Sequence, residues 1–356
     1  MENKPLVSVV LPTYNGSKWL SGSIESILTQ TYKNLELIIV DDASTDSSEE
    51  IIRKYCRKDP RVKSIRHKAN KKIPQSLNDG FAVAKGDFFT WTSDDNWYEA
   101  TAIEEMVNIL YSSEYDMVTA DFNIYNNDEF IEVIKTDCSV ESLSNRNSIG
   151  ACFLYTQKIA EKVGEYDSNK FLVEDYDYWL RILINGKIAH LNKTLYNYRL
   201  HSCSLTSTKQ NDIKYAEIFL KHEFYPILKR KFQNNDFSQM AHYIGYIEAL
   251  SEFSYRLNKE NIRKVSIYGS GFICYLLLKF LSKNNINVNH IFDSSAEIIS
   301  SQRYGYIVED LFSIYLSSNE TILIASDKFA QEIKHRINEY SVKNNVKLSV
   351  LVPISK

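Results

Sequence analysis

The chain has 356 residues, of which 44% are hydrophobic, and a formal net charge of −3 at pH 7. This length is typical of two domains, and the near balance of charge argues against a general nucleic-acid binder, whose surface would be strongly basic. No run of about 18 apolar residues occurs, so no membrane-spanning helix is expected, and the first residues lack the apolar core of a secretory signal.

The first 92 residues alternate between strand-like and helix-like segments. Predicted strands cover residues 7–11, 35–40, 62–65 and 88–92, and predicted helices cover residues 19–28, 47–55 and 73–84. Repeated strand–helix units of this length predict a parallel α/β sheet with right-handed crossovers. Such sheets bind ligands at the carboxyl ends of their strands.

Polar residues follow three of these strands. They are Pro12, Thr13, Tyr14 and Asn15, then Asp41 and Asp42, then Ser93, Asp94 and Asp95. Adjacent carboxylates repel each other unless a positive charge lies beside them. A divalent cation is the simplest candidate, and a hard cation held by few carboxylates usually also binds phosphate oxygens. The pattern therefore predicts a site for a phosphorylated ligand.

The alternation loosens after residue 116. Residues 117–122 predict another strand, 123–146 are polar and irregular, 174–184 predict a helix, 191–200 a strand and 211–257 helical structure. A second α/β unit follows, with strands at residues 265–268, 288–292, 321–325 and 348–352 and a helix at 272–281. We expect the boundary near residues 258–261.

The second unit opens with Gly269-Ser270-Gly271, and Cys274 stands where a dinucleotide-binding loop usually has its third glycine. Asp293 follows 24 residues after Gly269, about the distance of a ribose-binding acid. The motif predicts a Rossmann-like domain that either binds a nucleotide or serves as a docking or stabilising module. The five cysteines are scattered without a CxxC pair, which favours reduced thiols in a cytoplasmic protein.

Blocks at residues 7–15, 26–46, 78–95, 174–181 and 198–204 resemble glycosyltransferase family 2 in sequence, order and spacing. The resemblance covers roughly residues 5–206. It implies an α/β, Rossmann-like GT-A (nucleotide-diphospho-sugar transferase) domain over residues 1–206 that inverts configuration at the sugar. A helical connector over residues 207–260 and a smaller Rossmann-like α/β domain over residues 261–356 would follow.

The resemblance also implies the residues of the donor site. Tyr14 would stack on the base, unless it is an aromatic cap on the core, and Asp42 would accept a base N–H, as in uracil, unless it caps a helix. Arg199 would neutralise diphosphate, with an ordinary ion pair as the alternative. The remaining donor-site residues implied are Pro12, Thr13, Asn15, Asn78, Ser93 and Asp94.

The family's usual metal motif is Asp-x-Asp-Asp, and Thr92 stands at its first position here. We expect Asp95 to bind the metal, Mn²⁺ or Mg²⁺, and Asp94 to serve the donor sugar or ribose, with the two roles possible for either residue. His201 is a further candidate metal ligand through a neutral imidazole. Its alternative is an ordinary surface or core histidine.

Glu174 and Asp175 resemble the family's catalytic "ED" block. Inverting transfer needs one carboxylate to take the proton of the attacking hydroxyl, and we expect this base to be Asp175, with Glu174 positioning the acceptor. A helix amino terminus favours an ionised carboxylate, as a base requires. Two acids that simply cap a helix are the alternative.

The sequence therefore predicts a metal-dependent hexosyl- or N-acetylhexosaminyltransferase that uses a nucleotide-diphosphate sugar, with a UDP-sugar expected. The acceptor would be a glycan or lipid-linked glycan in bacterial surface polysaccharide synthesis, and the enzyme would work in the cytoplasm, at the inner membrane face if the acceptor is lipid-linked. Residues 211–235 are one candidate membrane contact, with a mixed surface helix as the alternative. Two alternatives are a sugar-nucleotide-binding protein without turnover and a bifunctional enzyme with a nucleotide-dependent C-terminal domain.

Overall fold

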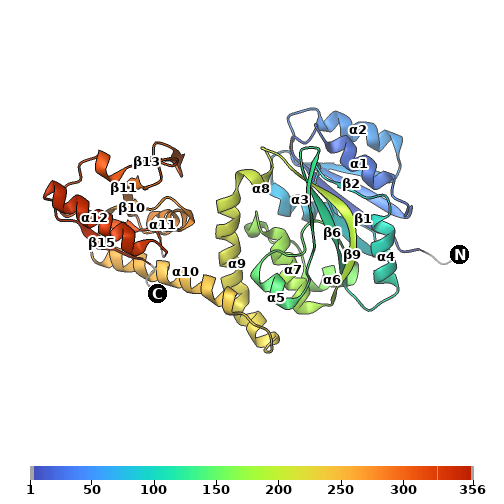
Figure 1. Cartoon of the computed structure of the whole chain (residues 1–356). Coiled ribbons are helices and arrows are strands. Elements are labelled where there is room, and N and C mark those ends of the chain that lie inside the picture. Colours follow the sequence, from blue (N-terminus) through green and yellow to red (C-terminus); the bar gives the residue numbers. More distant parts are fainter. Residues whose placement is uncertain (1–3, 327, 354–356) are drawn as a thin grey trace. The chain divides into compact units, whose positions relative to one another are not determined.

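A computed structural model describes residues 4–326 and 328–353 (Figure 1). The chain divides by its internal contacts into two compact units, Met1–Met240 and Ala241–Lys356. Each unit contains its own sheet. Within the described residues, no helix is both long enough and apolar enough to cross a membrane.

The sheet of the first unit has the strand order β3-β2-β1-β4-β8-β6-β9-β5, with β7 paired to β6. Its strands are β1 (Val7–Thr13), β2 (Leu35–Asp41), β3 (Val62–Arg66), β4 (Phe88–Trp91), β5 (Trp97–Tyr98), β6 (Met117–Asn126), β7 (Glu129–Ile134), β8 (Phe153–Thr156) and β9 (Ile188–Leu200). The strands β1 to β4 are mutually parallel, as predicted, whereas β8 is antiparallel to both of its neighbours. Every residue of β2 is buried, which explains its almost unbroken apolar run.

The first unit also contains the following helices. They are α1 (Leu20–Leu28), α2 (Ser48–Lys58), α3 (Lys72–Phe81), α4 (Ala102–Tyr111), α5 (Val140–Asn145), α6 (Gln157–Val163), α7 (Glu174–Asn185), α8 (Leu205–Thr208) and α9 (Gln210–Lys231). Apolar residues of α1, α2 and α4 share one core with Val7, Val9 and Leu11 of β1. Helix α3 packs against the side chain of Val10, where a Cβ on Gly80 would lie 2.5 Å from Val10 Cγ1. Because Val10 alternates with Val9 and Leu11, α3 covers the opposite face of the sheet.

The prediction of irregular structure for residues 123–146 is wrong. This segment contains the end of β6, the strand β7 and the helix α5. The residues of β7 are exposed on both faces apart from a half-buried Ile134, so the strand lacks the alternation of buried and exposed positions that predicts a strand. A left-handed Asn127, with φ of 54°, makes the turn of the β6–β7 hairpin.

The second unit has the strand order β12-β13-β11-β10-β14-β15. Its elements are α10 (Ser238–Lys259, which starts just before the division), β10 (Lys264–Tyr268), α11 (Phe272–Lys283), β11 (Asn287–Phe292), β12 (Gln302–Arg303), β13 (Tyr306–Glu309), β14 (Thr321–Ile324), α12 (Ala330–Asn344) and β15 (Ser349–Leu351). The strands β13, β11, β10, β14 and β15 are parallel, as the prediction of a smaller Rossmann-like sheet requires.

Candidate active site

Asp94 follows the last residue of β4, Trp91, by three positions, at the carboxyl edge of the first sheet. Its Oδ2 accepts a hydrogen bond of 2.5 Å from Thr13 Oγ1, which ends β1. Gly16 is so close that a Cβ at this position would lie 1.9 Å from the same oxygen. Burial and the neighbouring Asp95 raise the pKa of Asp94 to about 7. The ends of β1 and β4 thus meet at a carboxylate that a positive ligand would help to ionise.

Asp95 pairs with His201, which follows β9. Asp95 Oδ2 lies 2.9 Å from His201 Nε2, and Asp95 Oδ1 is buried without a hydrogen-bond partner among the described residues. The ring of Trp19 lies 4.3 Å from the imidazole, measured between centroids. A buried carboxylate oxygen without a partner is costly, so this arrangement suits a positively charged ligand.

A divalent cation fits this pair if other groups complete its coordination. Within the described part of the chain, no cluster of three or more His, Cys, Asp and Glu side chains could hold a metal. Mg²⁺ commonly keeps waters and is bound by one or two carboxylates together with substrate phosphates. Asp95 and His201 could therefore supply the protein's ligands, with Asp94 beside them.

Thr92, which replaces the usual first aspartate of the motif, points away from solvent. It is only 1% exposed, and its Oγ1 shares a hydrogen bond of 2.6 Å with the hydroxyl of Tyr196 on β9. A neutral hydroxyl suits this buried position, whereas a third carboxylate would face Asp94 and Asp95 without a paired cation.

Restoring the usual aspartate should therefore harm the fold. We expect Thr92→Asp to lower the free energy of unfolding by about 2 kcal/mol or more, because it buries an unpaired carboxylate. Thr92→Val, the matched control, removes only the hydrogen bond to Tyr196 and should cost about 1 kcal/mol. Urea unfolding of the three proteins measures both values. A Thr92→Asp protein as stable as the parent would show that the position tolerates charge.

Tyr14 presents an exposed ring at the same edge of the sheet. It is 51% exposed, and it follows the half-buried Pro12 and the buried Thr13 of β1. Asn15 has a left-handed backbone with φ of 57°, and its Oδ1 accepts the N–H of Thr45 at 2.8 Å. This tie between the loops after β1 and β2 fixes the backbone beside Tyr14, so its ring is available to stack on a ligand.

Asp42 is buried, and its carboxylate already has protein partners. Oδ1 lies 2.7 Å from His67 Nδ1 and accepts the N–H of Lys71 at 2.7 Å, while Oδ2 accepts the N–H of Lys72 at 2.9 Å. Because a carboxylate oxygen has two lone pairs, Oδ2 keeps one acceptor position. A ligand base could contact the Asp42 carboxylate through that position.

Asn78 and Ser93 differ in their availability to a ligand. The amide of Asn78 exchanges two hydrogen bonds with the backbone of Tyr166, at 2.8 and 2.9 Å, so its side chain fixes that segment. Ser93 is partly buried between Thr92 and Asp94. The structure therefore brings Ser93, but not the Asn78 amide, to the paired aspartates.

Arg199 connects the aspartate loop to the β6–β7 hairpin. Its Nε donates to the carbonyl oxygen of Asp95 at 3.0 Å, and its Nη1 donates to that of Asn127 at 3.0 Å. The guanidinium also forms an ion pair with Asp128 and lies over the rings of Trp19 and Trp97. These contacts place a positive charge at the edge of the site.

Glu174 and Asp175 begin α7, as predicted. Leu172, just before them, has φ of 82°, a conformation that costs a non-glycine residue roughly 1 kcal/mol or more and that recurs at functional sites. Asp175 Oδ1 accepts the N–H of Tyr176 at 2.7 Å, and Oδ2 accepts Asn147 Nδ2–H at 2.8 Å. Glu174 Oε2, in contrast, is buried without a hydrogen-bond partner in the part of the chain that the structure describes.

These environments affect the pKa values of Glu174 and Asp175 differently. Burial and the charge of Asp175 raise the pKa of Glu174 to about 8. Burial also raises the pKa of Asp175, but its two N–H donors act in the opposite direction. Since two close carboxylates resist ionising together, the pair holds its proton on Glu174 near neutral pH and its negative charge on Asp175.

Tyr198 shows that the two carboxylate groups converge. Burial, together with the negative charges of Asp95 and Asp175, raises the pKa of this phenol to about 12. Both aspartates therefore lie within electrostatic reach of a single residue on β9. A ligand that bridges the two groups would meet the Asp95–His201 pair at one end and the buried carboxyl groups of Glu174 and Asp175 at the other.

Sequence reasoning missed several residues of this site. Asn147 lies just after the segment that we predicted to be irregular and was given no role, and Trp19 was assigned only to a helix. Glu217 of α9 lies within electrostatic reach of Asp175, because burial and then the charge of Asp175 raise the pKa of Glu217, and Lys221 pairs with it. Apolar spacing could have predicted that α9 packs here, but no motif marked these polar residues.

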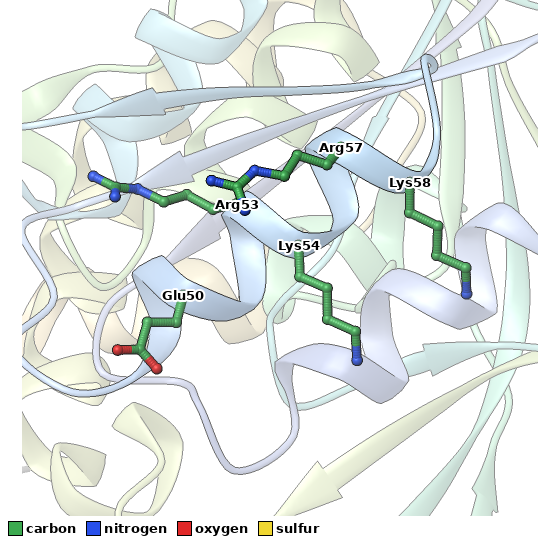
Figure 2. Close-up of a pocket in the computed structure, with 5 residues that line it drawn as sticks. All are labelled: Glu50, Arg53, Lys54, Arg57 and Lys58. Atoms are coloured by element: carbon green, nitrogen blue, oxygen red, sulfur yellow. The ribbon is translucent and has the colours of Figure 1, made fainter.

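A shallow surface pocket on α2 lies apart from these residues. It is lined by Glu50, Arg53, Lys54, Arg57 and Lys58, which all project from the same helix (Figure 2). None of the predicted site residues lines it. The cations extend to the carboxyl end of α2, where the helix dipole favours positive charge.

Comparison with solved structures shows the fold. The structure resembles Staphylococcus aureus TarS 1–349 in complex with UDP-GlcNAc, with a TM-score of 0.54 and 16% identity over 79% of this chain and 88% of that chain. It also resembles the mannosyltransferase PcManGT of Pyrobaculum calidifontis in complex with GDP-Man and Mn²⁺, with a TM-score of 0.51 and 13% identity over 80% and 86% of the two chains. The expected GT-A fold of the first unit and the smaller second sheet are confirmed.

Sequence comparisons agree with the fold. A family model described as "Glycosyl transferase family 2" matches residues 8–171, and one described as "C2185-like, N-terminal" matches residues 261–347. An uncharacterized glycosyltransferase of Rickettsia typhi is 30% identical over 60% of this chain and 70% of the relative. The glycosyltransferase GlyG of Streptococcus pneumoniae is 33% identical over 61% of this chain and 79% of the relative. The chain therefore belongs to glycosyltransferase family 2.

Proposed function

We propose that the chain is an inverting glycosyltransferase that moves a hexosyl or N-acetylhexosaminyl group from a nucleotide-diphosphate sugar to a glycan. The observation that carries this proposal is that Asp95, which pairs with His201, and Asp175 both lie within electrostatic reach of Tyr198. A UDP-sugar is the expected donor, supported by the fold shared with a protein solved with UDP-GlcNAc.

The donor would lie along the carboxyl edge of the sheet. Tyr14 would stack on the base, and Asp42 would accept a base N–H through the acceptor position left on Oδ2. Arg199 would favour the diphosphate electrostatically. Pro12, Thr13, Asn15, Asn78, Ser93 and Asp94 would shape the rest of the donor site, with Asn78 acting through Tyr166.

Asp95 and His201, with Asp94 nearby, would hold Mn²⁺ or Mg²⁺. The bound ion would neutralise the diphosphate that leaves the sugar. Asp175 Oδ2 or Oδ1 would take the proton of the acceptor hydroxyl while that oxygen attacks the anomeric carbon on the face opposite the diphosphate. Protonated Glu174 would hold the acceptor by donating from its carboxyl group.

The acceptor would be a growing glycan of the bacterial surface, free or carried on a lipid diphosphate. In the lipid-linked case, the enzyme would bind the inner membrane face from the cytoplasm, through α9 and its lysines. Sedimentation with anionic vesicles tests this contact. Recovery of the protein only in the supernatant would contradict it.

The proposed domains are residues 1–206 for transfer, 207–260 for a helical connector and 261–356 for a Rossmann-like domain. In the last of these, Asp293 Oδ2 accepts the N–H and the hydroxyl of Ser270 at 3.0 and 2.7 Å. A protein carboxylate thus contacts the glycine loop where phosphate would approach, which supports a structural module over the bifunctional alternative. Heat on titration of an Asp175→Asn full-length chain with NAD or NADP would instead favour a second activity.

A thermal-shift screen of UDP-, GDP- and dTDP-sugars, with and without Mn²⁺, tests the proposed function. We expect stabilisation by one nucleotide class, greater with the ion, because ligands of the folded state raise the melting temperature. Absence of any shift would refute sugar-nucleotide binding. A shift without transfer or donor hydrolysis would instead favour the binding protein without turnover.

A further inference from the structure

Asn147 contacts Asp175 from outside the helix that carries it. Asn147 follows α5, and its Nδ2–H donates to Asp175 Oδ2 at 2.8 Å. The other carboxylate oxygen accepts the N–H of Tyr176 at 2.7 Å. The two donors come from different elements, so together they fix the plane of the Asp175 carboxylate more firmly than the helix could alone.

The backbone around Asn147 is itself held in place. Ser148 Oγ donates to the carbonyl oxygen of Asp137 at 2.5 Å, and the N–H of Asp137 donates to that of Ser148 at 3.0 Å. The hydroxyl of Tyr176 donates to the carbonyl oxygen of Leu143 at 2.8 Å, which ties α7 to α5. Asn147 is therefore positioned as rigidly as the base that it contacts.

The Asn147 Oδ1 atom is buried and has no hydrogen-bond partner among the described residues. A buried acceptor without a donor is unfavourable, so a ligand that brings a donor to this point would gain affinity. Oδ1 and Nδ2 belong to one amide, which places this vacant acceptor beside the Asp175 carboxylate. A sugar presents several hydroxyl groups close together, and each one can donate.

We propose that Asn147 is a positioning residue that orients Asp175 through Nδ2 and binds, through Oδ1, a second hydroxyl of the acceptor next to the one that reacts. This inference rests on the proposed transferase function. It implies that the acceptor sugar carries a free hydroxyl beside the attacking one.

Charged and titratable groups surround Asp175 on every side that packs against it. Those within its electrostatic reach are Glu174 of α7, Glu217 of α9, and the phenols of Tyr166, Tyr176 and Tyr198, and Lys221 of α9 pairs with Glu217. The Asn147 amide lowers the pKa of Asp175, so its removal raises that pKa. Because the base must be ionised to act, the acidic limb of the rate profile should then move to higher pH.

The test compares Asn147→Ala with Asn145→Ala. Asn145 is a matched control, because its Oδ1 is also buried without a partner while its Nδ2 donates to Glu141 O rather than to Asp175. For Asn147→Ala we expect the KM for acceptor to rise about tenfold, the donor KM to stay unchanged and the acidic limb to shift upward. With an acceptor that lacks the hydroxyl beside the attacking one, such as a 2-deoxy sugar, the parent and Asn147→Ala should have similar KM values for acceptor.

Asn147→Asp keeps the shape but places a second carboxylate against Asp175, so it should shift the acidic limb further. Melting temperatures of all variants report whether the fold is retained. If Asn147→Ala behaves like Asn145→Ala in acceptor KM and in pH profile, the inference is overturned while the proposed function stands. If the parent chain neither transfers nor hydrolyses any donor, both fail.

Discussion

Asp175→Asn is expected to lower the rate of sugar transfer by about 10²–10⁴-fold, the usual contribution of a general base. The amide cannot take a proton, yet it keeps the size of the carboxylate and its position at the start of α7. Donor affinity should stay within a few-fold of the parent, because the aspartates behind β4 are untouched. Transfer rates with saturating donor and thermal shifts with the same donor measure the two effects.

Glu174→Gln is the matched control for this experiment. Glu174 carries the proton of the pair near neutral pH, so a neutral amide at position 174 should cost far less activity than one at position 175. Equal losses in the two variants would contradict the assignment of Asp175 as the base. An Asp175→Asn protein as active as the parent would remove the acid pair from the mechanism altogether.

The same pair predicts how stability depends on pH. The pKa of Glu174 is about 8 in the folded chain and 4.5 in the unfolded chain, so the folded state binds more protons between these values. Stability from this group is therefore fully present below about pH 4.5 and is lost as the pH rises toward 8. In urea unfolding, the free energy of unfolding of Glu174→Gln should decrease less between about pH 4.5 and pH 8 than that of the parent. An identical decrease would show that Glu174 is ionised in the fold.

The parts of the site that the sequence predicted are those that follow regular strands. Thr13, Asp42 and Asp94 could be placed together because parallel strands end at one edge of a sheet. Asp175 could be placed at the start of a helix because apolar spacing marked α7. What the pattern could not supply was the partner of each side chain, since hydrogen bonds such as that between Asp42 and His67 join residues from different elements.

Asn147 and β7 illustrate the opposite case. Asn147 follows a one-and-a-half-turn helix with no period long enough to detect, and β7 is exposed on both faces. Their structure depends on contacts with β6 and α7, which are distant in sequence. Tertiary contacts, rather than local propensity, thus decide the structure of these two segments.

Asp95→Asn should abolish the part of donor stabilisation that depends on Mn²⁺. The Asp95 carboxylate pairs with His201 through Oδ2 and has a buried Oδ1 without a partner, so it is the strongest candidate ligand for a cation. The amide keeps the hydrogen bond to His201 possible but removes the negative charge that attracts the ion. The melting temperature measured with donor alone should change little, whereas the further increase on adding Mn²⁺ should disappear.

His201→Ala and Glu50→Gln separate the possible causes of that result. His201→Ala should weaken the Mn²⁺-dependent increase without abolishing it, because a neutral ligand contributes less than a charged one. Glu50→Gln removes a carboxylate from the pocket on α2 (Figure 2), away from the site, and should leave the increase intact. A full Mn²⁺ response in Asp95→Asn would show that binding of the ion does not depend on the Asp95 carboxylate. That outcome would fit a chain in which Thr92 already replaces one carboxylate of the usual metal motif.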